Sequence, residues 1–174
     1  MWAILENASN YSERRLPSQV LTEQASALEA WIGLLRGHAS ATRELSARLV
    51  AEHDLTINDY EALLCLARAE QGRMRRVDLA DELLLTASGV TRLLEGLEQA
   101  GFVERASCAS DRRVTYAVLT EPGRAKLQEA SSSHVAGVQN FFEERFTSEE
   151  LRALAGLLGR LPEAGGPTPA DCTP

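Results

Sequence analysis

The sequence has few cysteines, few aromatic residues and no long apolar run. Its three cysteines, at 65, 108 and 172, match neither a disulfide framework nor a zinc site. No apolar stretch approaches the roughly 20 residues of a membrane span, and the apolar start Met1–Leu5 is too short for a secretory signal. A glycine-rich phosphate loop, a nucleophile elbow and a metal-binding spacing are also missing. We therefore expect a cytoplasmic protein that is not an enzyme and needs no metal or cofactor.

Acidic residues outnumber basic ones, which argues against a generally basic coat for nucleic acid. The 174 residues include 25 Asp and Glu and 18 Lys and Arg, for a net charge of −7. Residues 73–126 hold nine basic and eight acidic residues, so they are net +1 while the remainder is net −8. Arginines cluster at 73, 75 and 76 and again at 112 and 113. Such clusters produce a local positive field in a chain that is acidic overall.

Hydrophobic periodicity predicts a mostly helical chain with one small β-hairpin. Apolar residues at 28, 35 and 49, with others between them, predict a long helix over 21–52. Shorter helices are expected from 56 to about 71, over 77–84 and over 86–100, followed by strands at 102–106 and 114–119. Two more helices should follow. Four threonines stand at expected helix starts, where their hydroxyls can cap first-turn amides: Thr56, Thr86, Thr120 and Thr147.

The helix that starts at Thr86 combines an apolar stripe with a polar face. Val90, Leu93, Leu94 and Leu97 form the stripe, which we expect to point inward. Ser88, Thr91 and Arg92 then face outward near the helix start. Arg92 can pair with guanine, Ser88 and Thr91 can bind phosphate or base, and the helix N-terminus favours phosphate. The alternative is an ordinary solvated helix face.

The hairpin after this helix carries arginines in its turn. Arg112 and Arg113 can enter the minor groove of DNA, where the potential is most negative. Asp111 has the wrong charge for DNA, so we expect it to orient an arginine by a charge-assisted hydrogen bond. Arg75 and Arg76 are candidate phosphate contacts, although plain surface roles fit them equally well.

The order helix, turn, helix, strand, turn, strand predicts a winged helix-turn-helix unit. At these residues the sequence resembles the MarR family of bacterial transcription regulators. The matching features are Leu55-Thr56, the helix with Ser88, Thr91-Arg92-Leu93, the run Gly101-Phe102-Val103-Glu104-Arg105, the Asp111 and Arg113 turn, and Leu119-Thr120-Glu121 with Gly123. The resemblance covers roughly residues 21–160. It implies an obligate homodimer that represses nearby genes and is often released by a small aromatic or phenolic ligand.

Five segments are expected on this basis. They are a partly ordered extension at 1–20, a dimerisation helix at 21–53, a DNA-binding domain at 54–120, C-terminal dimerisation helices at 121–161 and a disordered tail at 162–174. The apolar seam of the first helix and the leucines at 151–158 exceed what one small core needs. Dimerisation through the chain ends would place two recognition helices over the half-sites of a palindromic DNA operator.

The sequence says less about an effector. His38, Arg43, His53 and Tyr60 lie on the first two expected helices, and arginine with tyrosine or histidine would suit an aromatic acid or a drug-like ligand. Surface or capping roles are the alternative for each of them. Cys108 near the hairpin turn leaves open a thiol-based redox regulator. A third hypothesis, beside the ligand-responsive and the redox-responsive regulator, is a winged-helix interaction module that does not bind DNA. The acidic net charge keeps this hypothesis open.

Overall fold

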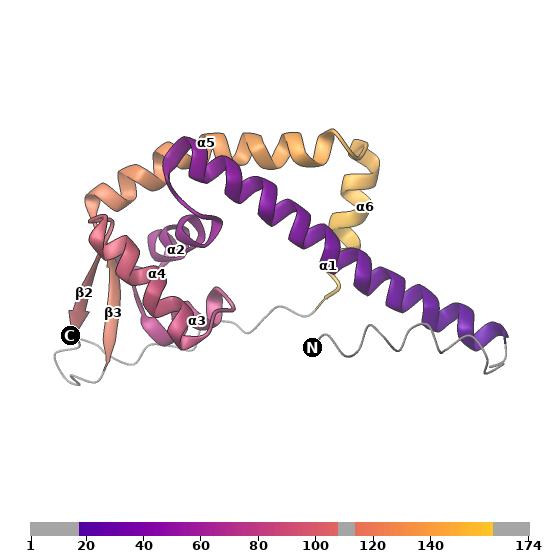
Figure 1. Ribbon diagram of the computed structural model, residues 1–174, viewed down its shortest axis with the longest axis horizontal. Coiled ribbons are helices and arrows are strands. Elements are labelled where there is room, and N and C mark those ends of the chain that lie inside the picture. The colour runs from indigo at the N-terminus through magenta and orange to yellow at the C-terminus, as the bar shows by residue number, and fades with distance from the viewer. Residues whose placement is uncertain (1–17, 108–113, 162–174) are drawn as a thin grey trace. The chain divides into compact units, whose positions relative to one another are not determined.

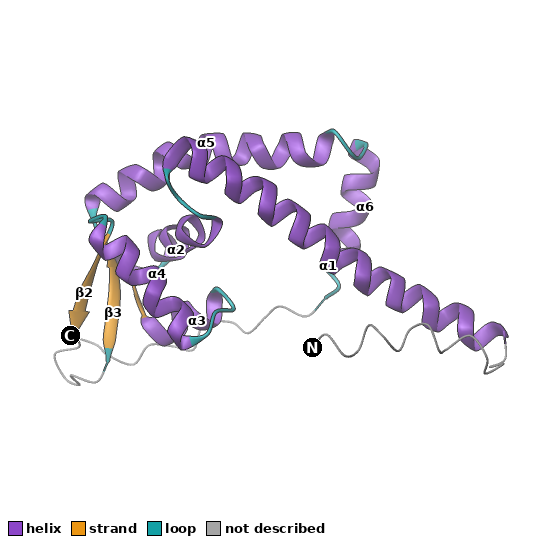
Figure 2. Ribbon diagram, viewed as in Figure 1, coloured by secondary structure: helices purple, strands orange, loops and turns teal. Residues whose placement is uncertain are grey.

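The computed structural model describes residues 18–107 and 114–161, with side chains from residue 26 onward. It is mostly helical with one small antiparallel sheet, as Figures 1 and 2 show. The helices are α1 (Ser18–His53), α2 (Ile57–Arg68), α3 (Arg76–Glu82), α4 (Ala87–Gln99), α5 (Glu121–Glu143) and α6 (Ser148–Leu158), and the strands are β1 (Arg73–Arg75), β2 (Val103–Ser107) and β3 (Thr115–Leu119). The sequence-based prediction of fold class is thus confirmed.

The chain divides into two compact units, residues 1–41 and residues 42–174. In the first unit the described part is the beginning of α1, whose side chains from 26 to 40 are all exposed. The second unit holds the hydrophobic core. Its fully buried large side chains are six leucines contributed by several elements: Leu49, Leu55, Leu63, Leu66, Leu79 and Leu94.

Threonine caps begin four of the helices, as the sequence predicts. The Thr56 and Thr147 hydroxyls accept the backbone N–H of Asp59 and Glu150, whose carboxylates accept the threonine N–H in return. Thr86 caps α4 and Thr120 caps α5, each through the N–H three residues further on. Each cap satisfies first-turn donors that would otherwise lack a partner. The starts of these four helices are therefore set by residues within one turn.

The sheet has three strands in the order β1-β3-β2, and the sequence predicted only two of them. Arg73 to Arg75 pair with Val118 to Tyr116 in antiparallel register, whereas the sequence analysis predicts no strand before the helix at 77–84. Three residues are too few to show the alternation of a strand, and their partner lies more than 40 positions away in sequence. Val77, the apolar residue with which the sequence-predicted helix begins, is not part of the core, since its side chain is 62% exposed. Because α3 starts at Arg76, its buried side is formed by Leu79 and Ala80.

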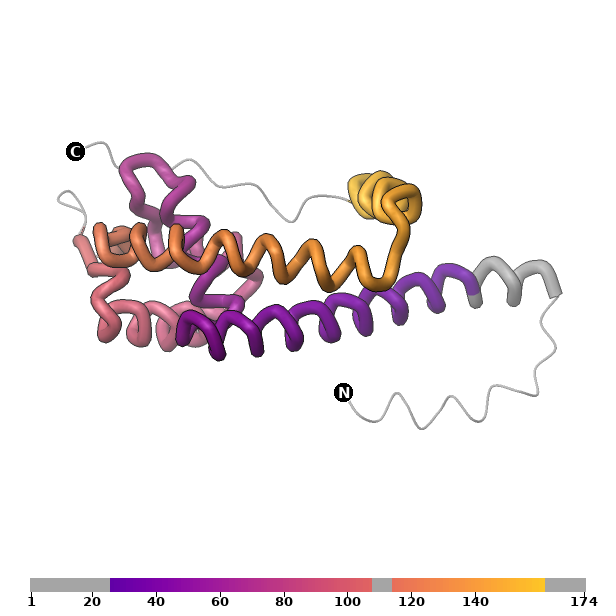
Figure 3. The backbone as a smooth tube through the Cα atoms, turned by 90° about the horizontal axis from the view of Figure 1, so that it is seen from above, coloured from indigo at the N-terminus to yellow at the C-terminus, as the bar shows by residue number. Residues whose placement is uncertain are grey.

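The start of α5 holds the end of α4 in place. Thr120 donates its N–H to the Phe102 carbonyl at 3.1 Å and its hydroxyl to the Gly101 carbonyl at 2.7 Å. Gly123 comes so close that a Cβ there would lie 2.0 Å from the Phe102 oxygen. The chain leaving α4 is therefore fastened to the first turn of α5, which continues as one unbroken helix in Figure 3.

Substituting Gly123 by Ala should destabilise the protein by about 2–4 kcal/mol, because the new methyl group meets a backbone carbonyl that cannot move aside easily. Gly96→Ala is the matched control, since a Cβ at position 96 of α4 has nothing within 4 Å. That variant should gain about 0.5–1 kcal/mol of stability from helix propensity. Denaturant unfolding measures both changes. A loss in Gly123→Ala no larger than about 0.5 kcal/mol would contradict the close approach.

Candidate nucleic-acid interface

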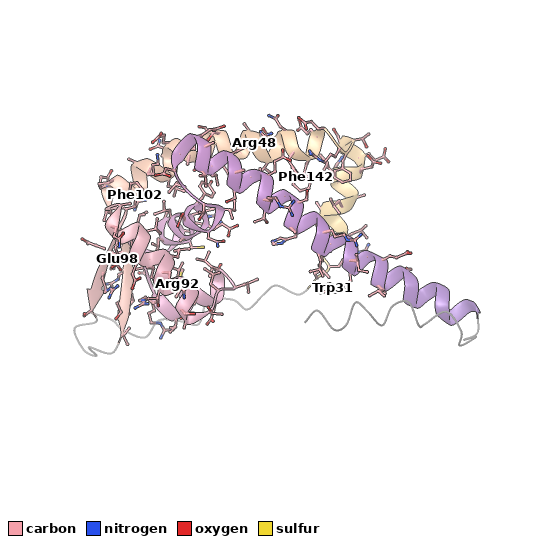
Figure 4. The ribbon with its side chains drawn as sticks, in the orientation of Figure 1. Trp31, Arg48, Arg92, Glu98, Phe102 and Phe142 are labelled. Atoms are coloured by element: carbon pink, nitrogen blue, oxygen red, sulfur yellow. The ribbon has the colours of Figure 1, made fainter. Side chains whose placement is uncertain are left out.

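Helix α4 presents a polar face because its opposite face is buried. Val90, Leu94 and Leu97 are each no more than 2% exposed, and Leu93 packs partly against the same core. Successive helical residues are rotated by about 100°, so Ser88 and Arg92 are exposed on the other side. Figure 4 labels Arg92 on this helix. Two of the three α4 residues proposed from the sequence therefore lie open to a ligand.

Thr91 lies differently from the sequence expectation, because it is half-buried. Its hydroxyl donates to the Ala87 carbonyl at 2.7 Å and accepts a hydrogen bond from the Arg76 guanidinium. Arg76 Nε is buried and has no hydrogen-bond partner in the described part of the chain. Arg76 thus connects the start of α3 to the first turns of α4. Sequence analysis placed both residues at the interface but missed their mutual contact.

Arg75 and Arg73 also make contacts within the protein. Arg75 donates from Nε and Nη2 to the two carboxylate oxygens of Asp78, at 2.6 and 2.7 Å. These side chains are only 25% and 11% exposed, so the pair fixes the junction of β1 and α3. The Arg73 guanidinium lies 5.3 Å from the centre of the Tyr116 ring, a cation–π distance. The first arginine cluster is therefore committed in large part to internal structure.

An ion pair that sequence analysis missed joins α4 to β2. Arg105 Nε and Nη2 donate to the two carboxylate oxygens of Glu98 at 3.2 and 3.0 Å. Figure 4 labels Glu98 on α4. Both partners are partly exposed, so the pair adds little stability, but its two parallel bonds restrict the angle between helix and strand. Glu98 and Arg105 are seven residues apart and lie in different elements, so neither helical nor strand periodicity in the sequence indicates that they form an ion pair.

The segment 108–113, between β2 and β3, lies outside the described residues. The two strands on either side of it pair in register up to Ser107 and Thr115. Cys108, Asp111, Arg112 and Arg113, all named from the sequence, fall within 108–113 and remain expectations. A hollow of about 440 Å³ opens beside the strands, where α3, α4 and β3 meet. Its lining includes Arg75, Arg76 and Thr91.

The four candidate effector residues separate into two kinds. His38 and Arg43 are exposed on α1. Tyr60 is 5% exposed and donates its hydroxyl hydrogen to Ser131 Oγ at 3.3 Å. His53, with 9% of its side chain exposed, is hydrogen-bonded through Nε2 to Ser133 Oγ at 2.6 Å. Tyr60 and His53 are thus each hydrogen-bonded to a serine of α5, whereas His38 and Arg43 lie exposed on the surface of α1.

His134 completes this group, and sequence analysis missed it. Its ring centre lies 4.4 Å from that of Tyr60, and its Nδ1 is buried without a hydrogen-bond partner in the described chain. Burial lowers the pKa of His134 below its usual value. His53 Nδ1 lies 3.5 Å from a Glu129 carboxylate oxygen, without the geometry of a hydrogen bond. Ser131 and Ser133 accompany His134 as the α5 partners of Tyr60 and His53, and a run of serines within a helix carries no sequence signal of that role.

Neither a membrane-spanning helix nor a metal site occurs in the described ranges. Every helix there is too short or too polar to span a bilayer. No group of three or more His, Cys, Asp or Glu side chains among those residues is arranged to hold a metal ion. Cys65 is half-buried on α2, and burial raises the pKa of its thiol.

Comparison with known proteins gives consistent matches. The MarR family model matches residues 55–115. The chain is similar to the structure of AbsC, a MarR family transcriptional regulator from Streptomyces coelicolor, with 34% identity, coverage of 83% of this chain and 93% of that chain, and a TM-score of 0.67. It is also similar to Sco3205, a MarR family regulator from the same organism solved in complex with DNA, with 25% identity, coverage of 85% and 89%, and a TM-score of 0.70. Among curated proteins, the HTH-type transcriptional regulator YwhA of Bacillus subtilis is 27% identical over 127 residues, which are 73% of this chain and 88% of that one.

Acidification should destabilise the protein through His134. Because burial lowers its folded-state pKa, the unfolded chain takes up a proton first as the pH falls. The stabilising contribution of the neutral ring is complete above about pH 6.5, the ordinary histidine pKa, and is lost below it. His134→Gln should therefore lose less thermal stability than the parent between about pH 7.5 and 5.5. His38→Gln, at an exposed position, should follow the parent. An identical pH profile for His134→Gln and the parent would refute this role.

Proposed function

The chain belongs to the MarR family and is a transcriptional regulator that binds DNA, and on this premise we propose that it acts as a homodimer on a palindromic operator. In this proposal it represses nearby genes and leaves the operator when a small aromatic, phenolic or drug-like ligand binds. Repression follows physically if the dimer occupies promoter DNA that the transcription machinery needs.

The observation that carries the proposal is the exposed face of α4. Arg92 and Ser88 project from a helix whose other face is fixed in the core. In a winged helix-turn-helix this helix enters the major groove with its N-terminal part against the bases. Arg92 is proposed to read guanine and Ser88 to bind phosphate or base. Thr91 contributes from a half-buried position, and Arg76 positions Thr91 through their hydrogen bond.

The turn at 108–113 is proposed to supply the minor-groove contact. Arg113 is the candidate for insertion, with Arg112 beside it and Asp111 orienting the turn. The Glu98–Arg105 pair supports this arrangement from the described side, since it restrains β2 relative to α4. Major-groove and minor-groove contacts would then be held at a fixed angle.

Exposed apolar side chains support the homodimer. On α1, Leu28 and Trp31 are 59% and 55% exposed. On α6, which has no buried residue, Leu157 is 56% exposed. Apolar residues gathered on helices in this way mark surfaces that a partner covers. A twofold dimer would use the same surface of both chains and would present two copies of α4 to DNA.

The cluster formed by Tyr60, His53, His134, Ser131 and Ser133 is the proposed effector site. It offers a buried phenol, two histidine rings whose Nδ1 atoms have no hydrogen-bond partner among the described residues, and two serine hydroxyls, at the meeting of α2, α5 and the end of α1. Polar groups in a largely apolar surrounding suit an aromatic ligand that carries a hydroxyl or acid group. Of the four residues named from sequence, His53 and Tyr60 are retained for this role.

Arg92→Ala should change the base preference of the protein. Selection of bound fragments from a random DNA pool should return a twofold-symmetric motif for the parent, and the variant should lose preference at one symmetric pair of positions. Arg68→Ala removes an exposed arginine from α2 instead and should return the parental motif. Failure of the parent to enrich any motif would refute the proposed function. A motif unchanged by Arg92→Ala would remove only the role of that residue.

Carboxylates among the exposed apolar residues of α1, which include Leu28, Trp31 and Leu35, should convert the proposed dimer into monomers. Trp31→Asp combined with Leu35→Asp buries two charges in the proposed dimer surface, which costs several kcal/mol. Light scattering should report the mass of two chains for the parent and of one chain for this variant. Ala30→Asp is the control, because position 30 is exposed and about 160° around the helix from position 28. A double variant that remains dimeric would place the interface elsewhere.

A further inference from the structure

The turn between α3 and α4 has a leucine where the backbone is left-handed. Leu84 has φ of 52°. Its N–H donates to the Asp81 carbonyl at 3.2 Å, and the Leu85 N–H donates to the Ala80 carbonyl at 2.8 Å. These two bonds are those of a Schellman motif, in which the left-handed position is normally glycine. A bulky side chain at this position is strained, because its Cβ crowds the neighbouring backbone.

The end of α4 forms the same motif with the expected residue. Gly101 has φ of 76°, its N–H donates to the Glu98 carbonyl at 3.0 Å, and the Phe102 N–H donates to the Leu97 carbonyl at 2.9 Å. The same unit of the protein thus ends two helices with the same pair of hydrogen bonds. One ends at glycine without strain, and the other ends at leucine.

The core does not compensate for the strain at Leu84. Its side chain is 76% exposed, the highest value among the exposed large apolar side chains of the described residues. Burial of the Leu84 side chain within this chain therefore adds little to the stability of the folded protein and does not offset the strain. Strained residues of this kind cluster at binding sites, where an external contact offsets their cost.

We propose that Leu84 is a DNA-contacting residue that packs against apolar groups at the edge of the major groove, either a thymine methyl or the C–H face of a deoxyribose. This inference rests on the proposed function. Leu84 stands two residues before Thr86, the cap of α4, and four before exposed Ser88, so an exposed apolar side chain lies next in sequence to the N-terminal end of α4 that the proposed function places against DNA. Asp81 and Glu82, just before it, are exposed. Neither carboxylate can donate a hydrogen bond to a phosphate oxygen, so the side chain with which this turn can attract DNA is the apolar one of Leu84.

Three substitutions separate the strain from the contact. Leu84→Gly relieves the strain and removes the side chain, so the melting temperature should rise by about 2–4 °C while operator affinity falls roughly three- to tenfold. Leu84→Ala keeps a Cβ at the left-handed position, so affinity should fall without that thermal gain. Leu84→Met keeps both the strain and an apolar chain and should bind like the parent. The full-length protein and the operator selected by the parent are used throughout.

Operators with deoxyuridine in place of thymidine, one symmetric pair at a time, identify the DNA group. A loss of parental affinity at one pair, with no further loss in Leu84→Gly, assigns the contact to a thymine methyl. If affinity is insensitive to deoxyuridine but reduced in Leu84→Gly, the contact is to deoxyribose. Unchanged affinity in Leu84→Gly, with Arg92→Ala still altering base preference, would overturn the inference and leave the proposed function intact. If the parent enriches no operator, both fail together.

Discussion

The burial of one face of α4 is the constraint on which the rest of the interface depends. Val90, Leu94 and Leu97 lie in a core of fully buried leucines, so the helix cannot rotate about its axis without exposing them. That restriction alone directs Ser88 and Arg92 outward. The two ends of α4 are then fixed separately, by the Thr86 cap and by the hydrogen bonds from Thr120 to the Gly101–Phe102 turn. A DNA-reading surface needs this rigidity, since a base contact tolerates little error in position.

The arginines at 73, 75 and 76 make contacts within the protein. Three arginines precede or begin α3, yet Arg73 lies over Tyr116, Arg75 is paired with Asp78 and Arg76 binds Thr91. A cluster that looked like a phosphate-binding patch in the sequence thus holds β1, α3 and α4 together. With an acidic chain around it, the proposed contact with DNA depends on few cations such as Arg92. Geometry then has more influence than net charge, which favours a selective reader over a non-specific binder.

Sequence predicted what local chemistry decides and missed what distant partners decide. The four threonine caps, the stripe of α4 and Gly101 each depend on residues within one or two turns, and each was predictable. β1 depends on β3, Arg105 on Glu98 across a turn, and His134 on Tyr60 from another helix. None of these pairs shares a period or a motif. For Thr91 the sequence predicts one feature and misses the other. Its position on α4 was predicted, but the hydrogen bond that it accepts from Arg76 was not.

The proposed release of DNA by a ligand would require an element that both sites can move, and α2 meets this requirement. One side of α2 places Tyr60 against Ser131 and His134 of α5. Two leucines of the same helix, Leu63 and Leu66, are fully buried in the core that holds Leu79 of α3 and Leu94 of α4. A ligand that displaces the Tyr60 contact changes the packing of α2, and a close-packed core transmits that change instead of absorbing it. In this proposal the ligand must bind more tightly to the displaced arrangement than to the one in which Tyr60 contacts α5, because equal affinity for both would leave DNA binding unchanged.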